Sequence, residues 1–95
     1  MDDRLKSPAV DYLFKAVLSL KNEDECYRFF EDVCTISELK SIAQRLDVAR
    51  KLDEGESYTE IANSTGASTA TISRVKRYLN YGADGYRIIL DRTKV

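Results

Sequence analysis

Apolar residues recur three or four positions apart along the first half of the chain, which is the spacing of one helix face. The first such run begins with Ser7 and Pro8, residue types favoured at a helix N-cap and at the first helical position. The second run follows Asn22 and carries three acids in its first turn, where they suit the positive end of the helix dipole. These patterns predict a helix starting at Pro8 and a second helix over 23–33.

A third run begins at Thr35, which forms a capping-box pattern with Glu38. Its apolar stripe consists of Leu39, Ile42, Ala43, Leu46, Ala49 and Leu52. Gly55 follows as a typical C-terminal stop. The pattern predicts a longer helix over 36–54.

The second half contains shorter runs. A capping box at Ser57 and Glu60 opens a predicted helix over 58–64, and a further helix is predicted from Ser68 or Thr69 to Tyr81, ended by Gly82. The segment DGYRIILDR has strand propensity, but a lone strand would have nothing to pair with, so a short sixth helix is favoured. The expected class is all-α with roughly six helices, with termini 1–6 and 93–95 frayed.

The two helices around Gly66 fit a helix-turn-helix. Ile61 and Ala62 provide a packing face, Ala62 allows a close approach, and Gly66 tolerates the turn. The inward side of the second helix is expected to consist of Ile72, Val75, Tyr78 and Leu79. Its outward positions are Ser68, Thr69, Ala70, Ser73, Arg74 and Arg77.

Those outward residues suit DNA. Small hydroxyl side chains at the helix start allow close approach to bases and phosphates, and the free amides and dipole of the helix N-terminus attract phosphate. Arg74 and Arg77 can reach phosphate or guanine, and Thr71 and Lys76 complete the predicted DNA-binding set. Within 61–83 the charged residues are three bases and no acid. An ordinary helical hairpin with a basic, solvated face is the alternative interpretation.

Charge is unevenly distributed along this chain of 95 residues, which is the length of one domain. Residues 1–39 carry nine acids and five bases, a net charge of −4, whereas residues 40–95 carry ten bases and seven acids, a net charge of +3. So small a domain buries a limited fraction of its surface, so a partner subunit would stabilise it.

Several function classes find no support. The chain has no histidine and two cysteines, Cys26 and Cys34, so neither a tetrahedral zinc site nor a Ser-His or Cys-His catalytic pair is expected. We expect no enzyme activity, no cofactor and no metal. Without an apolar run of membrane length or a signal sequence, a cytoplasmic protein with reduced cysteines, either in the core or half-buried, is predicted.

The stretches CTISELKSIAQRLDVARKLDEG, SYTEIANSTGAS and ATISRVKR resemble the Trp repressor family, in its small Trp repressor-like branch of Gram-positive bacteria. The resemblance covers roughly residues 10–92. It implies an intertwined homodimer with dimerisation helices over about 8–54 and a DNA-binding segment over about 57–81, acting as a repressor at a palindromic operator in double-stranded DNA.

The resemblance also implies a possible effector pocket. In members that bind tryptophan, the ligand lies between two arginines, which match Arg45 and Arg74, and the threonines of that pocket match Thr35 and Thr71. Those members have glycine where this chain has Val75, and an isopropyl group would intrude on an indole-sized cavity. We therefore expect no response to tryptophan. Arg45 is instead expected to be a solvated arginine, paired with Asp47, Glu54 or acids of the second helix.

Two function classes stay open at this point. The first is a dimeric DNA-binding regulator of transcription, and the second is a helical protein-interaction module that does not bind DNA. The sequence identifies neither the operator, nor the regulated genes, nor a small-molecule effector. It also does not distinguish repression from activation.

Overall fold

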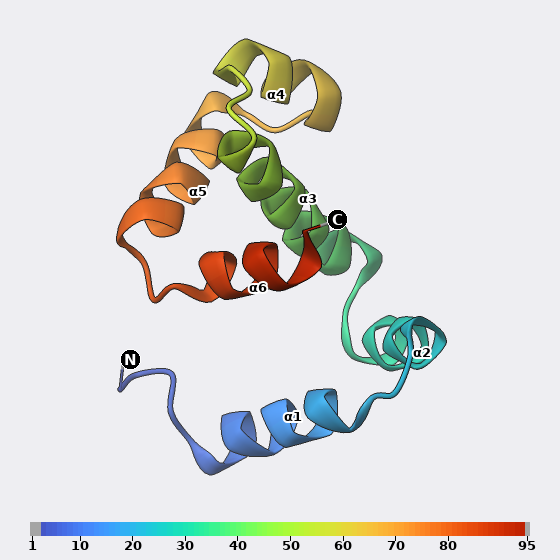
Figure 1. The fold of residues 1–95 in the computed structure, drawn as a ribbon. Helices are drawn as coiled ribbons and strands as arrows, with labels where there is room; N and C mark the ends of the chain where they lie inside the picture. Colours follow the sequence, from blue (N-terminus) through green and yellow to red (C-terminus); the bar gives the residue numbers. More distant parts are fainter. Residues whose placement is uncertain (1–2, 95) are drawn as a thin grey trace. The chain divides into compact units, whose positions relative to one another are not determined.

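A computed structural model describes residues 3–94 of the chain. These residues form α1 (Pro8–Ser19), α2 (Glu23–Val33), α3 (Ile36–Asp53), α4 (Tyr58–Thr65), α5 (Thr69–Tyr81) and α6 (Gly85–Thr93) (Figure 1). No strand occurs between residues 3 and 94, which confirms the all-α class and the helical prediction for the last segment. Thr93 belongs to α6, so the predicted fraying is wrong there; residues 1, 2 and 95 lie outside the described residues.

The predicted helix starts are confirmed by their side-chain caps. The Ser7 hydroxyl accepts a hydrogen bond from the Val10 amide at 3.1 Å, and the Asn22 carbonyl oxygen accepts one from the Glu25 amide at 2.9 Å. Each cap satisfies an amide that a helix start otherwise leaves unpaired. Of the helix ends that were predicted, two differ: α3 stops one residue earlier, at Asp53, and α4 continues one residue further, to Thr65.

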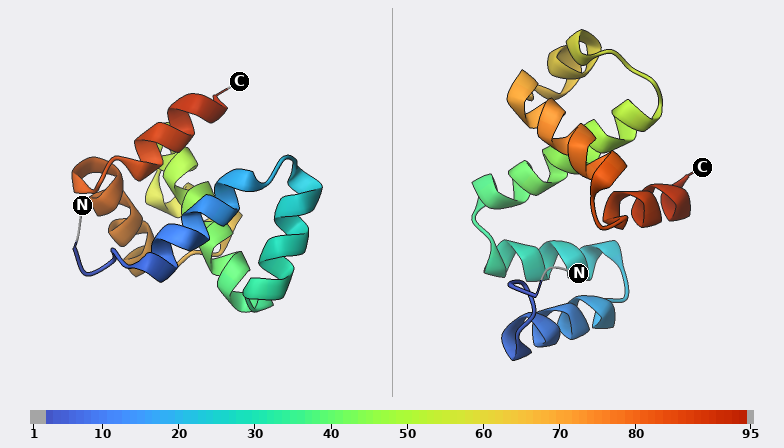
Figure 2. Two further views of the ribbon diagram at one scale, coloured as in Figure 1. Left: turned by 90° about the horizontal axis from the view of Figure 1, so that it is seen from below. Right: turned by 90° about the vertical axis from the view of Figure 1, so that its left-hand side faces the viewer.

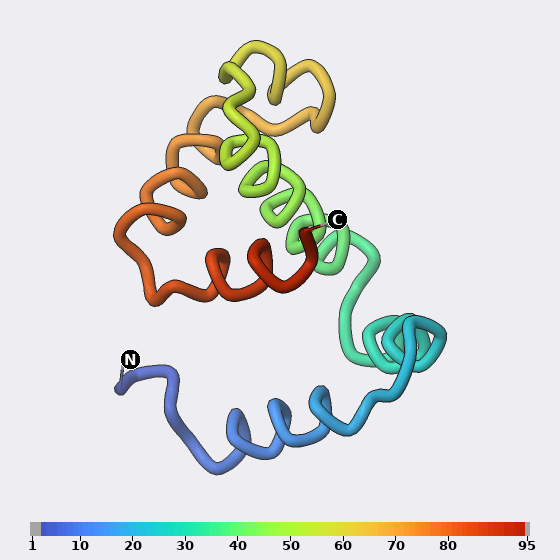
Figure 3. The backbone as a smooth tube through the Cα atoms, in the orientation of Figure 1, coloured from blue at the N-terminus to red at the C-terminus, as the bar shows by residue number. Residues whose placement is uncertain are grey.

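The chain divides into two units, at Leu39 and Lys40. The N-terminal unit contains α1, α2 and the first residues of α3, and none of its described residues is buried. Phe29 and Phe30 pack edge to face in α2, with ring centroids 5.3 Å apart. The backbone trace of α1 and α2 is followed most easily in Figure 3. These helices form without a core of their own.

The C-terminal unit contains the rest of α3 and α4, α5 and α6. Figure 2 shows α5 crossing α3, with α4 and α6 at the two ends of α5. One buried cluster joins all four helices: Val48, Ala49, Ile61, Ala67, Ile72, Val75, Leu79 and Leu90. Asp53 at the end of α3 forms an ion pair with Arg87 of α6 and a longer one, 3.8 Å, with Lys94.

One predicted inward residue of α5 needs correction, and the predicted apolar stripe of α3 is only partly buried in the single chain. Val48 and Ala49 are the buried residues of α3, whereas Ile42 and Leu46 of the predicted stripe are exposed. Tyr78 is also exposed rather than inward, unlike Leu79. Helical spacing identifies an apolar face, but it does not say whether that face meets the chain's own core or an open surface.

A candidate nucleic-acid interface on the fifth helix

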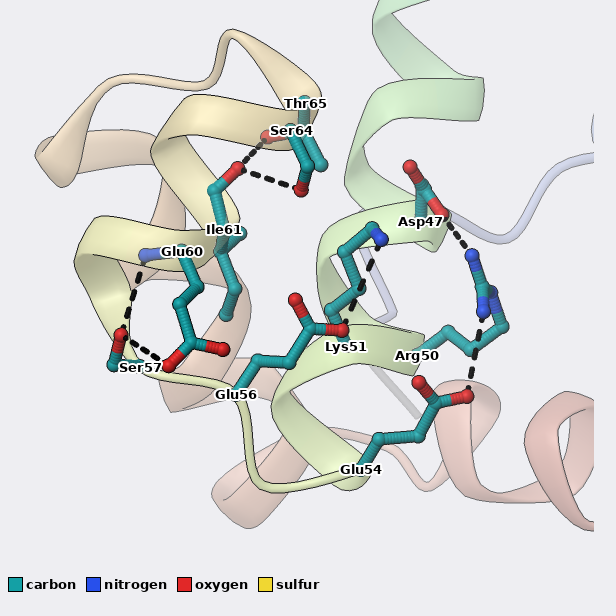
Figure 4. Close-up of polar contacts among 10 residues, drawn as sticks. All are labelled: Asp47, Arg50, Lys51, Glu54, Glu56, Ser57, Glu60, Ile61, Ser64 and Thr65. Carbon is teal, nitrogen blue, oxygen red and sulfur yellow. Dashed lines mark hydrogen bonds and ion pairs between the residues drawn. The ribbon is translucent and has the colours of Figure 1, made fainter.

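A tight turn joins α4 to α5 and fixes the angle between them. Gly66 adopts the left-handed conformation at φ 75°, and its amide donates to the Ala62 carbonyl oxygen at 3.0 Å. The Thr65 hydroxyl donates to the Ile61 carbonyl oxygen at 2.7 Å (Figure 4) and accepts from the Ala67 amide at 3.1 Å. Both bonds hold the turn rigid, so the helix-turn-helix geometry is specified locally.

A side chain of α3 fastens this turn to the rest of the unit. The Gln44 side-chain amide donates to the Thr65 carbonyl oxygen at 3.1 Å. At the other end of α4, Ser57 and Glu60 form the predicted cap, with the Glu60 amide donating to the Ser57 hydroxyl at 3.2 Å (Figure 4). Helix α4 is thereby capped at its N-terminal end and bonded to α3 at its C-terminal end.

The start of α5 is capped by Ser68. Its hydroxyl oxygen accepts from the Thr71 amide at 3.1 Å, and the same hydroxyl donates to the Thr71 hydroxyl at 3.1 Å. These two predicted DNA-binding side chains are therefore engaged with each other, and Thr71 is half-buried. The first turn contains no acid, so the positive end of the helix dipole is not neutralised there.

The outward side of α5 is exposed as predicted. Thr69, Ala70, Ser73, Arg74 and Arg77 are all exposed, while Ile72, Val75 and Leu79 hold the opposite side in the core. Within residues 3–94, neither arginine forms an ion pair with an acid. Both guanidinium groups are consequently available to an anionic partner.

Lys76 differs from the other predicted contacts. Its ammonium nitrogen lies over the ring of Tyr58, the first residue of α4, 5.7 Å from the ring centroid. Tyr58 is half-buried and packs against the core. A cation over an aromatic face is held by the negative charge of the ring face. The charge of Lys76 therefore lies at the flank of α5 that faces the start of α4.

Two of the predicted partners of Arg45, Asp47 and Glu54, are wrong. Asp47 and Glu54 both pair with Arg50, at 2.6 and 3.3 Å (Figure 4), and they raise the pKa of the Arg50 guanidinium, Asp47 more strongly. Arg45 is exposed and donates to the Ser41 hydroxyl at 3.2 Å. Its expected role as a solvated helix residue fits this position.

The other predicted effector residues take separate places. Arg45 lines an open groove of about 430 Å³ together with six apolar or aromatic residues and one glycine, and neither Thr71 nor Arg74 belongs to that lining. The groove residues are Ile42, Arg45, Leu46, Tyr78, Ala83, Gly85, Tyr86 and Ile89. Thr35 lies in the N-terminal unit, where it caps α3 with Glu38 and lowers the pKa of that carboxyl by hydrogen bonding. Val75 is 1% exposed, so its side chain occupies the core of the C-terminal unit.

Sequence reasoning missed Tyr81, the last residue of α5. It is 87% exposed, more than any other large apolar or aromatic side chain of residues 3–94. Gly82 ends the helix as predicted, although its backbone is not left-handed. A β-carbon at this residue would lie 2.3 Å from the Tyr78 carbonyl oxygen, so this backbone conformation requires glycine. Tyr81 follows Arg77 by four residues, a spacing that places both side chains on the same helix face, and this spacing could have identified it.

Two further features bear on the classes of function considered. Between residues 3 and 94, no helix combines the length and apolar character needed to span a membrane. The described residues contain no cluster of three or more acids and cysteines arranged to hold a metal ion. Cys26 and Cys34 are free and half-buried, as predicted.

Comparison with known proteins gives a consistent picture. Residues 8–94 match the family model of the Trp repressor protein. The chain is 61% identical over 92 residues to the uncharacterized protein YerC of Bacillus subtilis strain 168, a match that covers 97% of this chain and 88% of YerC.

Two crystal structures share the fold at high sequence identity. A TrpR-like protein from Eubacterium eligens superposes with a TM-score of 0.93 at 58% identity, over 96% of this chain and 94% of that one. A proposed Trp repressor from Staphylococcus aureus superposes with a TM-score of 0.91 at 52% identity, over 95% of this chain and 90% of that one.

Proposed function

Because the chain belongs to the Trp repressor family, a family of DNA-binding regulators, we propose that it is a homodimeric, sequence-specific regulator of transcription. Helix α5 enters the major groove of double-stranded DNA, and α4 supports it from behind. The observation that carries this proposal is the division of α5 into a buried apolar side and an exposed basic side without acids.

The DNA contacts fall into three groups by position. Thr69, Ala70 and Ser73 are small and exposed, so the helix backbone can approach base edges closely. Arg74 and Arg77 contact guanine or phosphate, because each is an exposed cation without an acidic partner in the described chain. Ser68, Thr71 and Lys76 contribute at the edges of this surface, Lys76 from the flank next to α4.

A homodimer is supported by the apolar side chains that the single chain leaves uncovered. In α1, Phe14 is 58% exposed and Leu18 is 84% exposed. Folded proteins seldom leave apolar surface of this extent to water unless it meets a partner. We propose that this partner is a second copy of the chain. A twofold axis would place the two α5 helices about 34 Å apart, which is one turn of the duplex. The dimer would then bind a palindromic operator and act as a repressor.

The decisive experiment is selection of duplexes from a random-sequence pool, followed by binding measurements over a salt series. The affinity of wild type for a selected duplex is expected to fall steeply as salt rises, since phosphate contacts release counterions. Arg77→Ala should weaken binding to every duplex and reduce the salt slope by about 1. Arg92→Ala in α6 is the matched control, because it removes the same charge from an exposed position outside α4 and α5.

The same experiment decides against the competing class. A protein-interaction module that does not bind DNA would recover no enriched duplex, and its apolar interface would show little dependence on salt. Failure to enrich any sequence, or equal effects of the Arg77 and Arg92 substitutions, would contradict the proposed DNA-binding role.

A further inference from the structure

We propose that Tyr81 is an additional phosphate contact, which extends the DNA-binding surface to the last turn of α5. This inference rests on the proposed DNA-binding function and adds a residue to it. The starting observation is exposure: 87% of the Tyr81 side chain is open to solvent, although aromatic side chains normally bury most of their area.

The position of Tyr81 on the helix is the second observation. Ala70, Arg74, Arg77 and Tyr81 are spaced i, i+4, i+7 and i+11, which places them along one helix face. That face is opposite the buried residues Ile72, Val75 and Leu79. Tyr81 therefore lies in line with the residues proposed to meet DNA, one turn or about 5.4 Å beyond Arg77.

The backbone at this position is held in place. The Gly82 amide donates to the Tyr78 carbonyl oxygen at 2.9 Å, which closes the last turn of α5. Because a β-carbon at residue 82 would collide with that carbonyl oxygen, glycine is needed for the chain to turn here. The Tyr81 side chain thus extends from an ordered helix end rather than from a loop.

The chemistry of the side chain favours phosphate as the partner. A phenol hydroxyl donates one hydrogen bond, and tyrosine is among the side chains that contact DNA phosphates. The two arginines on the same face create a positive field that attracts the strand, and no acid lies on that face of α5.

The test uses Tyr81→Phe, which removes only the hydroxyl and keeps the aromatic ring, with wild type as the reference. Affinities are measured for a duplex selected with wild type and for a random-sequence duplex of the same length, over one salt series. Tyr81→Phe should weaken binding to both duplexes by about tenfold. Its salt slope should stay that of wild type, because a neutral donor releases no counterion.

The outcomes separate this inference from the function on which it rests. If wild type binds no duplex, the proposed function fails and this inference fails with it. If Arg77→Ala lowers the salt slope while Tyr81→Phe binds both duplexes as wild type does, only the Tyr81 contact is overturned. A loss confined to the selected duplex would also overturn it, since a phosphate contact carries no sequence preference. Unchanged thermal unfolding of Tyr81→Phe would show that the loss is not caused by misfolding.

Discussion

In the C-terminal unit, eight apolar side chains from α3 to α6 meet in one buried cluster, whereas no described residue of the N-terminal unit is buried. Both units nevertheless form capped, regular helices. Local sequence therefore decides where helices form, and burial decides which of them are stable in the single chain. We infer that the C-terminal unit is stabilised largely by its own core, while the N-terminal unit depends on a second copy of the chain.

The largest expected effect tests the core of the C-terminal unit. Ile72 of α5 is completely buried, so Ile72→Ala removes packed methyl groups and leaves a cavity. The free energy of unfolding should fall by about 2–5 kcal/mol. Chemical denaturation at a fixed protein concentration measures this change, and Ile88→Ala at a 45% exposed position of α6 is the control. Equal losses for the two variants would mean that the core assignment is wrong.

The next effect tests the dependence of the N-terminal unit on a partner. Phe14 packs into no core of the single chain, so Phe14→Ser should weaken the dimer rather than the C-terminal core. The wild-type melting temperature should rise with protein concentration, because dimer formation is coupled to folding. In Phe14→Ser, the monomer fraction measured by light scattering should increase.

Lys15→Ser provides the control for this substitution, since it places the same residue at the neighbouring exposed position of α1. A wild-type melting temperature that stays flat over about a hundredfold dilution, together with a monomer mass, would remove the case for a partner subunit.

A smaller effect concerns the ion pair between α3 and α6. Arg87 lowers the pKa of the Asp53 carboxyl below its ordinary value of 3.8, chiefly by a hydrogen bond, and Lys94 contributes. Because the folded-state pKa is lowered, this stabilisation is present above pH 3.8 and is lost as pH falls through the folded-state pKa.

Asp53→Asn should therefore lower the melting temperature at pH 7 and have less effect as the pH falls below 3.8. Glu54→Gln is the matched control, because the Glu54 carboxylate, directly after α3, pairs with Arg50 of α3 rather than with another helix. A melting-temperature difference that stays constant across this acid range would show that the charge of Asp53 is not what matters.

The contrast between the units also shows what the sequence could predict. Side-chain caps and helical spacing predicted α2 to α5 to within one residue, because caps such as Asn22 and Ser68 act on neighbouring amides. The sixth helix was predicted without bounds, and its N-cap residue Asp84 forms no side-chain cap. The inward positions of α5 were also predicted from nearby residues, because Ile72, Val75 and Leu79 follow the turn whose geometry Gly66 fixes.

Other features could not be predicted from caps and helical spacing. The pairing of Arg50 with Asp47 and Glu54 in place of Arg45 follows from which way each side chain leaves α3. The exposure of Tyr78 could not be predicted, because the same apolar spacing serves an internal core and an interface. The contact of Lys76 with Tyr58 depends on how α4 and α5 cross.

The smallest expected effect is the absence of a response to tryptophan. Val75 is packed in the core with Ile72 and Val48, so α5 is held by its own side chains without a ligand. Protein interiors leave few voids that could accept an indole ring beside an added isopropyl group. We expect no saturable heat on titration with millimolar tryptophan, and a DNA affinity that is the same with and without it.

This expectation concerns the C-terminal unit, where Arg45 and Arg74 are both exposed. Arg45 lines an open groove to which Arg74 does not contribute, so a ligand bound between the two arginines would have to bring them into one site. Isothermal titration tests binding, and a duplex-binding assay with and without tryptophan tests coupling. A gain in DNA affinity of more than about tenfold, or about 1.4 kcal/mol of coupling, would show that the pocket persists despite Val75. The effector would then act through α5, and the core of the C-terminal unit would be less rigid than its burial indicates.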